Sequence, residues 1–397
     1  MPALAGADAV AQSPGARSNL RTYLILHPAF ALTGVLQAVG GALLPALAPA
    51  FHLSDSDAGL LFLLYFAGTS TGPFFFRHRY VRTTALGFAL MAVCCLALAF
   101  AGRPLLGPLF LLLGVSVGIP MSGGSLYVGR VFGERCAPMI SFLNFTWSIG
   151  ALAAPLLAAR VLAAHSYRTV YLVLACAATA AAVACALGLR EITEPDPKRD
   201  ATGRAAAVKL IVLFALAAFL QVGMENTAAA WLATYAQRTN GTGIVLAVAS
   251  SALYWAGFLA SRGVASFLLL RIRASRILAI AVVAALAAAV ALAAVPTARE
   301  RGVAMIVLGI ALAPIYPLVI AGFFARTRRT LDSRWVLAMA GCGGSVLPWL
   351  AGWISSTAGN LRIGILVLPA ALVVMAVLLP ALTAGSAAAH DAAAEPR

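Results

Sequence analysis

The sequence predicts an all-α integral membrane protein with twelve transmembrane helices arranged as two six-helix repeats. Its composition, the spacing of its apolar runs and an internal similarity all point this way. Of the 397 residues, 62% are hydrophobic and 10% are charged, and the mean hydropathy is +0.94. Water-soluble domains carry about 45–50% apolar and about 25% charged residues, so this composition fits a surface solvated by lipid.

Apolar runs bounded by charged residues, Gly and Pro define the helices, since a membrane span needs about 20 apolar residues. We expect them at 23–49, 55–76, 83–101, 105–130, 137–162, 168–189, 207–236, 243–270, 275–295, 302–325, 334–357 and 361–384. The one long polar connection runs from Arg190 to Lys209. The expected parts are therefore a cytoplasmic N-terminal tail (1–22), an N-terminal six-helix bundle (23–190), a cytoplasmic linker (191–206), a C-terminal six-helix bundle (207–384) and a disordered C-terminal tail (385–397).

The positive charges predict how the chain lies in the membrane. The net charge is +15, and the loops on one side hold twenty Lys and Arg residues against seven on the other. Cytoplasmic loops carry such an excess, so both termini are expected in the cytoplasm. These charges would face anionic lipid headgroups, and we expect no nucleic acid partner. Lys198 and Lys209 are the only lysines, and this arginine and alanine bias is typical of a GC-rich bacterial genome, which favours a bacterial inner membrane.

The two halves of the chain resemble each other. Short segments recur in the same order, with the residue offset growing only from 184 to 195. The matched pairs are Leu36-Gln37 with Leu220-Gln221, Tyr65-Phe-Ala-Gly68 with Tyr254-Trp-Ala-Gly257, Arg77-x-Arg79-x-x-Arg82 with Arg271-x-Arg273-x-x-Arg276, and Leu113-Gly114 with Leu308-Gly309. Two parallel repeats of six helices place a substrate site at their interface, near the middle of the membrane.

This organisation resembles the major facilitator superfamily over essentially the whole chain. The shared features are six plus six helices, a polar central loop and basic turns after the second and eighth helices. The resemblance implies a cytoplasmic gate at those turns, which begin at Arg77 and Arg271. The acidic residue of the family's helix 2–3 signature is absent from Gly68-x-x-x-Gly72-Pro-Phe-Phe-Phe-Arg77, so the usual gate of the first half is not carried over in full.

Three segments are similar to the branch of fucose, glucose and galactose symporters. They are Gly223-Met-Glu225-Asn226 with Trp231-Leu-Ala-Thr-Tyr235, Leu308-Gly-Ile-Ala-Leu-Ala-Pro314-Ile-Tyr316-Pro317, and Leu143-Asn144 through Gly150-Ala-Leu-Ala-Ala-Pro155. The resemblance implies a sugar as substrate. Proton-linked members carry membrane carboxylates in helices 1 and 4, and this chain has none there, so their coupling positions do not transfer.

Glu225 is the one acidic residue that the helix map places inside the hydrocarbon layer. An ionisable group there is costly and marks a functional site by default, so Glu225 is the candidate for both substrate binding and ion coupling. The alternative is a structural carboxyl bonded to its neighbours. Gln221 lies one turn earlier on the same face, and Gln37 is its counterpart in the first repeat. Facing amides can bind sugar hydroxyls, although interhelical hydrogen bonding explains either Gln equally well.

The remaining substrate candidates are polar and aromatic residues on predicted inner faces, because sugars stack on rings while amides take their hydroxyls. Packing or an interfacial position is the alternative for each ring. The full predicted substrate set is Gln37, Asn144, Trp147, Gln221, Glu225, Asn226, Tyr254, Trp255 and Tyr316.

Arg262 is the second charge inside the membrane, and we expect it to bind helix-end or loop carbonyls near the inner gate, or to extend to the cytoplasmic surface, rather than to pair with Glu225. Pro120, Pro314 and Pro317 are expected to bend the fourth and tenth helices. The predicted gating set is Arg77, Arg262, Arg271, Pro314 and Pro317.

These features predict a secondary active transporter for a small polar solute such as a monosaccharide, coupled to protons or sodium through Glu225. We expect a monomer in contact with membrane lipids, and no enzyme activity, cofactor or metal site. One alternative is a multidrug or metabolite exporter of the same superfamily, in which apolar aromatic lining would matter more than amides. A non-transporting membrane receptor or a membrane enzyme is disfavoured, because the sequence shows no carboxylate or histidine cluster and no soluble signalling domain.

Overall fold

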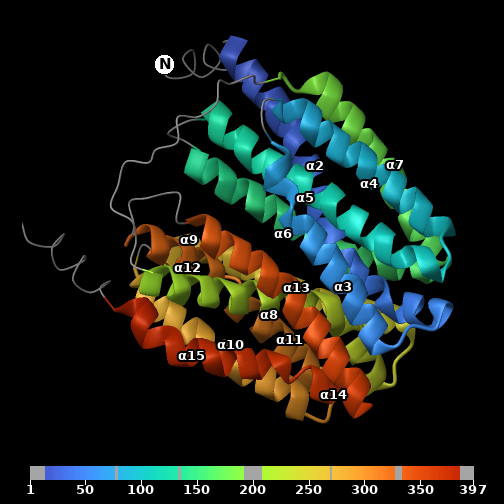
Figure 1. Cartoon of the computed structure of the whole chain (residues 1–397), viewed down its shortest axis with the longest axis vertical. Coiled ribbons are helices and arrows are strands. Elements are labelled where there is room, and N and C mark those ends of the chain that lie inside the picture. Colours follow the sequence, from blue (N-terminus) through green and yellow to red (C-terminus); the bar gives the residue numbers. More distant parts are fainter. Residues whose placement is uncertain are drawn as a thin grey trace, which may run out of the picture.

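The protein is helical throughout the part of the chain that the computed structural model describes, which is residues 14–76, 79–132, 136–191, 208–268, 271–326 and 333–384 (Figure 1). Eleven helices in these ranges are long and apolar enough to cross a membrane. The twelfth crossing is made by α3, which has 16 residues and continues into a short 3₁₀ turn. The expected set of twelve helices is therefore confirmed.

The first half of the molecule contains six crossings and the second half contains six more. The first half comprises α2 (Pro14–Phe51), α3 (Asp55–Ser70), η1 (Gly72–Phe75), α4 (Tyr80–Phe100), η2 (Arg103–Leu105), α5 (Leu106–Phe132), α6 (Cys136–Leu162) and α7 (Tyr167–Gly188). The second half comprises α8 (Val208–Asn240), α9 (Ile244–Leu268), α10 (Ala274–Ala294), α11 (Ala298–Leu312), α12 (Ile315–Phe324), α13 (Ser333–Ala358), α14 (Leu361–Gly364) and α15 (Val367–Thr383).

Most helix ends lie within a few residues of their predicted positions, and the exceptions have local causes. The second helix was expected to reach residue 76 but ends at Ser70, where the Thr71 hydroxyl donates to the Gly68 carbonyl over 2.7 Å. Pro73 then follows, and its ring and missing N–H prevent the α-helix from continuing. The first helix begins at Pro14, nine residues earlier than expected, and proline is well suited to a first helical turn.

The tenth helix, which was expected to bend, is instead split into α11 and α12 with Pro314 between them. Proline removes the N–H that would bond one turn back and clashes with that carbonyl, so the helix breaks here. Pro317 lies in the first turn of α12. The fourth crossing, α5, remains one helix through Pro120.

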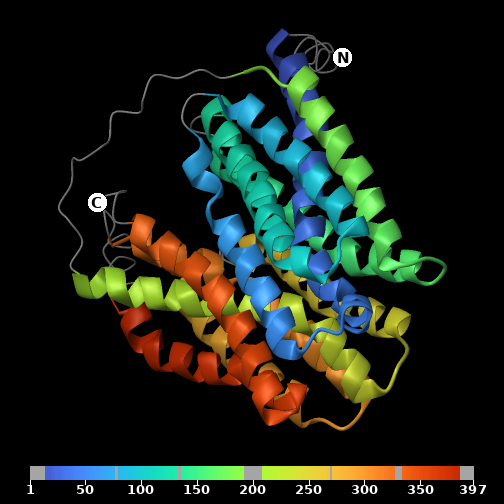
Figure 2. The same ribbon diagram turned by 45° about the vertical axis from the view of Figure 1, so that its right-hand side comes forward.

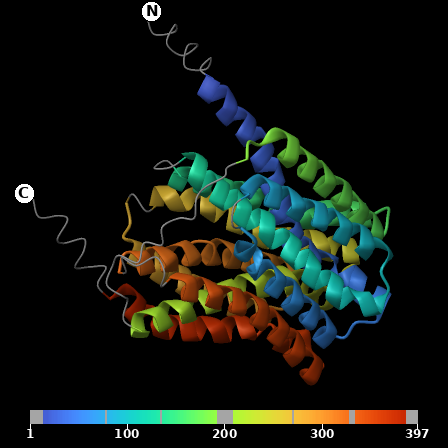
Figure 3. The same ribbon diagram turned by 45° about the horizontal axis from the view of Figure 1, so that its top comes forward.

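The two halves converge at one end of the molecule and diverge toward the other (Figures 1 and 2). The start of α2 and the end of α15 lie on the diverging side, which we call the terminal end; Figure 3 shows both there. The converging side, which holds the turn between α2 and α3 and helix α14, is the distal end. Across the halves, α3 packs on α13, α6 on α9 and α2 on α8. Over their described residues, α5 and α12 pack mainly within their own halves.

The internal repeat reappears as a matched pair of helix contacts. In the first half, α5 crosses α3 so closely that a Cβ on Gly114 would lie 2.0 Å from the carbonyl oxygen of Tyr65. In the second half, α11 crosses α9 in the same way, and a Cβ on Gly309 would lie 2.0 Å from the carbonyl oxygen of Tyr254. These are the residues that align in the sequence repeat. Small residues allow membrane helices to approach closely, so each half is tightly packed at the same place.

We expect Gly309→Ala to destabilise the second half, because the added methyl group meets a backbone carbonyl that cannot move without displacing α9. The expected loss is roughly 1–3 kcal/mol, the usual cost of overpacking. Thermal unfolding of the purified protein in detergent measures it. Gly107→Ala is the control, since the nearest atom to its Cβ is a leucine methyl at 3.4 Å. Equal unfolding temperatures for the two variants would contradict the close crossing.

Candidate functional site

Glu225 lies near the middle of α8, a helix that packs on α2 of the first half. Its side chain is only half-buried, although its neighbours Met224 and Asn226 are buried. Among the described residues no hydrogen bond or ion pair engages its carboxylate. A carboxylate without a partner at this depth is available to a proton, a cation or a solute.

An aromatic cluster joins the two halves close to this carboxylate. Trp147 of α6 meets Trp255 of α9 edge to face, with their ring centroids 5.9 Å apart. Tyr254 and Phe258 contact Trp255 at centroid distances of 5.0 and 5.5 Å. All four rings are buried, and both the Trp147 indole nitrogen and the Tyr254 hydroxyl lack a hydrogen-bond partner. The cluster therefore packs the interface and leaves two buried polar atoms without a hydrogen bond.

Arg262 reaches from α9 across the interface to α6. Its Nη1 atom donates to the Ser148 hydroxyl over 3.0 Å and to the backbone carbonyl of Asn144 over 3.4 Å. The guanidinium also lies over two rings, 5.4 Å from the centroid of Trp147 and 4.5 Å from that of Phe258. Arg262 thus binds the middle of a facing helix instead of the helix end or loop carbonyl expected for it, because α6 packs directly on α9.

Glu225 and Arg262 are near enough to interact electrostatically, and Tyr254 and Tyr316 lie within the same range of Glu225. In the described part of the chain, however, no ion pair joins the carboxylate to the guanidinium. Both side chains are half-buried, as is Tyr316 at the start of α12. The site thus holds two opposite charges apart, with a phenol beside them.

Two amides predicted to bind substrate form hydrogen bonds within the second half instead. The Gln221 side-chain nitrogen donates over 2.8 Å to the carbonyl of Leu312, which lies where the break between α11 and α12 interrupts the helix. The Asn226 side chain donates over 3.1 Å to the carbonyl of Gly344 on α13. These contacts fit interhelical hydrogen bonding, although the side-chain oxygen of buried Gln221 keeps no partner.

Gln37 of α2 lies beside a small cavity. The cavity has a volume of about 10 Å³ and is lined mainly by the first half, with only Ala230 contributed by α8. This volume is about the size of one water molecule. The Gln37 side-chain oxygen has no hydrogen-bond partner. The facing of the two amides across a central cavity therefore stays a prediction.

The other predicted residues occupy varied positions. Asn144 is exposed, and its amide donates over 3.0 Å to Ile140 within its own helix, so only its backbone takes part in the Arg262 contact. Arg271 is exposed in the turn between α9 and α10. Pro314 and Pro317 lie at the helix break. Arg77 lies outside the described residues.

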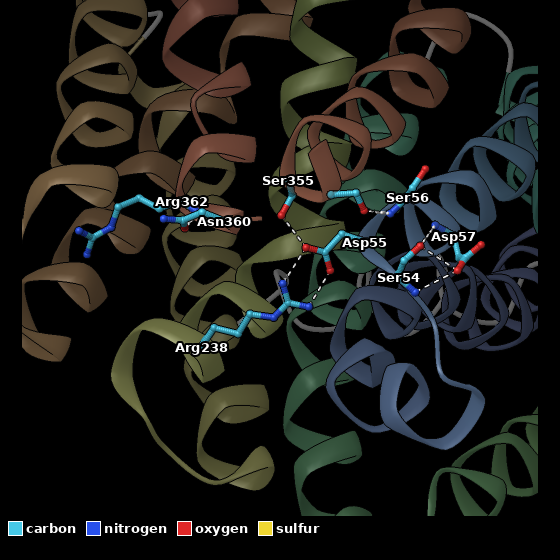
Figure 4. Close-up of polar contacts among 9 residues, drawn as sticks. Ser54, Asp55, Ser56, Asp57, Arg238, Ser355, Asn360 and Arg362 are labelled. Atoms are coloured by element: carbon cyan, nitrogen blue, oxygen red, sulfur yellow. Dashed lines mark hydrogen bonds and ion pairs between the residues drawn. The ribbon is translucent and has the colours of Figure 1, made fainter. Parts of the chain in front are cut away.

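A polar network at the distal end was not foreseen as a link between the halves (Figure 4). Asp55 of α3 accepts two hydrogen bonds from Arg238 of α8, over 2.6 and 2.7 Å, and a further one from the Ser355 hydroxyl. The backbone N–H of Ser56 donates to the Ser356 hydroxyl over 2.8 Å. The Asp55 side chain is only 12% exposed. We call Asp55, Arg238 and Ser355 the distal latch.

Serine followed by acidic residues just before an apolar run is typical of a helix cap. Ser54 and Asp57 form such a cap at the start of α3, as a reciprocal capping box. Asp55 instead points across the interface. A helix cap can be recognised from neighbouring residues in the sequence. The contact between Asp55 and Arg238 cannot, because the two residues are 183 positions apart.

Several solved structures share this fold, and their titles describe transporters. A bacterial homologue of the human lysosomal transporter Spinster, inward-facing and occupied, covers 96% of this chain and 98% of its own at 15% identity, with a TM-score of 0.69. The D-xylose-proton symporter covers 91% and 97% at 13% identity, with a TM-score of 0.72. The transporter FucP in its outward conformation covers 92% and 99% at 18% identity, with a TM-score of 0.63. At these identities the likeness establishes the fold alone.

Sequence comparison finds one curated relative and a family. The Sodium-dependent glucose transporter 1 of Rattus norvegicus is 32% identical over 149 residues, which is 34% of this chain and 30% of that protein. The aligned part is thus under a third of the relative's length. A sequence model of the Major Facilitator Superfamily matches residues 26–329. With its twelve membrane helices, the chain belongs to the Major Facilitator Superfamily and is a multi-pass membrane transporter of that family.

Proposed function

We propose that this transporter moves a small polar solute of the monosaccharide type by alternating access, with Glu225 coupling the movement to protons or sodium. The observation that carries the proposal is the pair of half-buried charges, Glu225 and Arg262, held unpaired between the two halves. Ionisable side chains inside a membrane protein mark solute and ion pathways. Their position at the repeat interface is where this architecture binds its substrates.

A sugar is supported by the chemistry around these charges. Glu225 can accept hydrogen bonds from ring hydroxyls, and Tyr316 can donate or accept. The names of the similar proteins point the same way, since they include a glucose transporter and a xylose symporter. The aromatic cluster is packed on itself here, so its rings would contact a solute only after the halves move.

The orientation follows from the basic residues. The terminal end carries the larger share of Lys and Arg, so we place it, and both termini, in the cytoplasm of a bacterial inner membrane. The distal latch then closes the outer face while the halves diverge toward the cytoplasm (Figure 2). This arrangement corresponds to an inward-facing state.

Uptake into proteoliposomes tests the proposal. Purified protein is reconstituted with an imposed proton or sodium gradient, and radiolabelled hexoses, deoxyhexoses and sugar derivatives are offered one at a time. We expect at least one sugar to accumulate only when a gradient is present. If no polar solute accumulates and only amphipathic drugs cross, the protein is an exporter and the sugar assignment is wrong.

A further inference from the structure

Arg262 keeps most of its hydrogen-bonding capacity unused. A guanidinium has five N–H donors, and here Nη1 alone is engaged, by Ser148 and by the carbonyl of Asn144. Within the described ranges, neither Nε nor Nη2 has a hydrogen-bond partner. The side chain is half-buried, so these N–H groups retain accessible surface inside the interface. A guanidinium in the membrane is costly unless an anion accompanies it.

The unused donors form one edge of the guanidinium. Nε–H and Nη2–H point the same way and match the spacing of two carboxylate oxygens, which is why arginine binds carboxylates in a bidentate manner. The opposite edge is fixed by Ser148, and the planar face is held over the rings of Trp147 and Phe258. The donor edge is therefore preorganised, and binding an anion would cost little rearrangement.

Glu225 is the only nearby anion of this chain in the described region, and it is not paired with Arg262. Both groups instead face the interface without a hydrogen bond between them. A carboxylate and a guanidinium held apart leave room for a solute that brings its own acidic group to the arginine. Protonated Glu225 could then donate to a hydroxyl of that solute.

From this geometry we propose that the transported solute is an anionic sugar, whose carboxylate binds the Nε and Nη2 edge of Arg262. This rests on the proposed function and narrows its substrate class. A neutral sugar would leave the donor edge empty, and a cationic sugar would meet a like charge. A site built to bind a polar group discriminates strongly against analogues that lack it, because its own donors are then left unpaired.

A matched set of three sugars tests the proposal on the intact protein. D-glucuronate, D-glucose and D-glucosamine share a pyranose ring and differ in charge. The thermal stability of the detergent-purified protein is measured against the concentration of each, since a ligand of the folded state raises apparent stability by mass action. We expect D-glucuronate to bind about tenfold to hundredfold more tightly than D-glucose, the range that charge-assisted hydrogen bonds supply.

Variants connect this preference to the arginine. Arg262→Gln should abolish the preference for D-glucuronate, and Arg262→Lys should retain part of it, because the charge remains while the bidentate edge is lost. Arg299→Gln, which removes an exposed arginine of α11, should keep the full preference. The unfolding temperature without ligand shows whether each variant folds, and the comparison of sugars on the unaltered protein needs no variant.

Equal or tighter binding of D-glucose, no binding of any of the three, or an unchanged preference in Arg262→Gln would each overturn the anionic sugar. The proposed transport function fails on a different result, namely the absence of gradient-driven uptake for every sugar in the proteoliposome panel. Uptake of neutral hexoses alone would therefore reject the anionic substrate and leave the sugar transporter standing.

Discussion

Glu225→Gln is expected to abolish accumulation of the solute against its gradient while leaving exchange of bound solute intact. Glutamine keeps the shape and the hydrogen-bonding oxygen of the side chain but can neither take up a proton nor neutralise a cation. If Glu225 couples ion movement to the change of state, the accumulation ratio falls to one. Uptake and counterflow in the same proteoliposomes measure the two properties separately.

The matched control is Glu300→Gln. Glu300 is exposed at the start of α11, where it forms a capping box with Thr297, and glutamine also serves that cap. This variant should transport normally. Gradient-driven uptake at the wild-type level in Glu225→Gln would remove Glu225 from the coupling mechanism and leave it as a structural carboxyl.

Asp55→Asn is expected to open the distal end. The charge of Asp55 holds Arg238 by two hydrogen bonds and also binds Ser355, so its loss removes a charge-assisted contact between the halves. Because the Arg238 side chain is 42% exposed, we expect the loss to be only about 1–2 kcal/mol. This shifts the balance between states by a factor of roughly 5–30 toward the outward-open one.

Pulsed electron spin resonance measures that shift. Spin labels at Ala164, in the turn between α6 and α7, and at Arg362 of α14 report the distance between the halves at the distal end. The native cysteines are replaced first, and transport is checked in that background. Arg103→Gln is the control, because its 3.2 Å contact with Asp57 stays within the first half.

The distances should lengthen in Asp55→Asn and in Arg238→Gln but not in Arg103→Gln. Exchanging the partners, as Asp55→Arg with Arg238→Asp, should restore much of the closed population. An unchanged distance distribution in Asp55→Asn would mean that the packing of α3 on α13 keeps the distal end closed and that the latch adds no measurable stability.

Hydropathy predicted the helices well because each crossing must bury its own backbone hydrogen bonds in a run of apolar residues. The break at Pro314 was predictable for the same local reason, since proline disrupts a helix wherever it lies within one. The early end of α3 was not predicted, because the run of phenylalanines after Pro73 is apolar enough to continue a span. Apolarity shows where a chain can cross the membrane, but it does not show which backbone conformation the chain adopts there.

The site was only partly predictable because helical periodicity identifies a face and not the neighbour of that face. Glu225 could be singled out from its depth alone. The hydrogen bonds of Gln221 to Leu312 and of Arg262 to Ser148 depend on which helices meet, and no spacing within one helix encodes that. Arg238 lies just beyond the helix expected at 207–236, and its partner Asp55 is on the other half, so nothing near it in the sequence indicates their contact.

The matched glycine crossings carry a consequence for how the two copies have diverged. Tyr65 and Tyr254 occupy the same place in each, yet Tyr65 donates to the Leu36 carbonyl over 2.9 Å while the Tyr254 hydroxyl has no partner. The same offset that aligns Gln37 with Gln221 aligns Gly41 with Glu225. The two copies have therefore diverged at equivalent positions, with the tyrosine hydroxyl bonded in the first and unbonded in the second. Under the proposed function, a solute held by Glu225 and Arg262 would move with the second half, against which the first half would rotate.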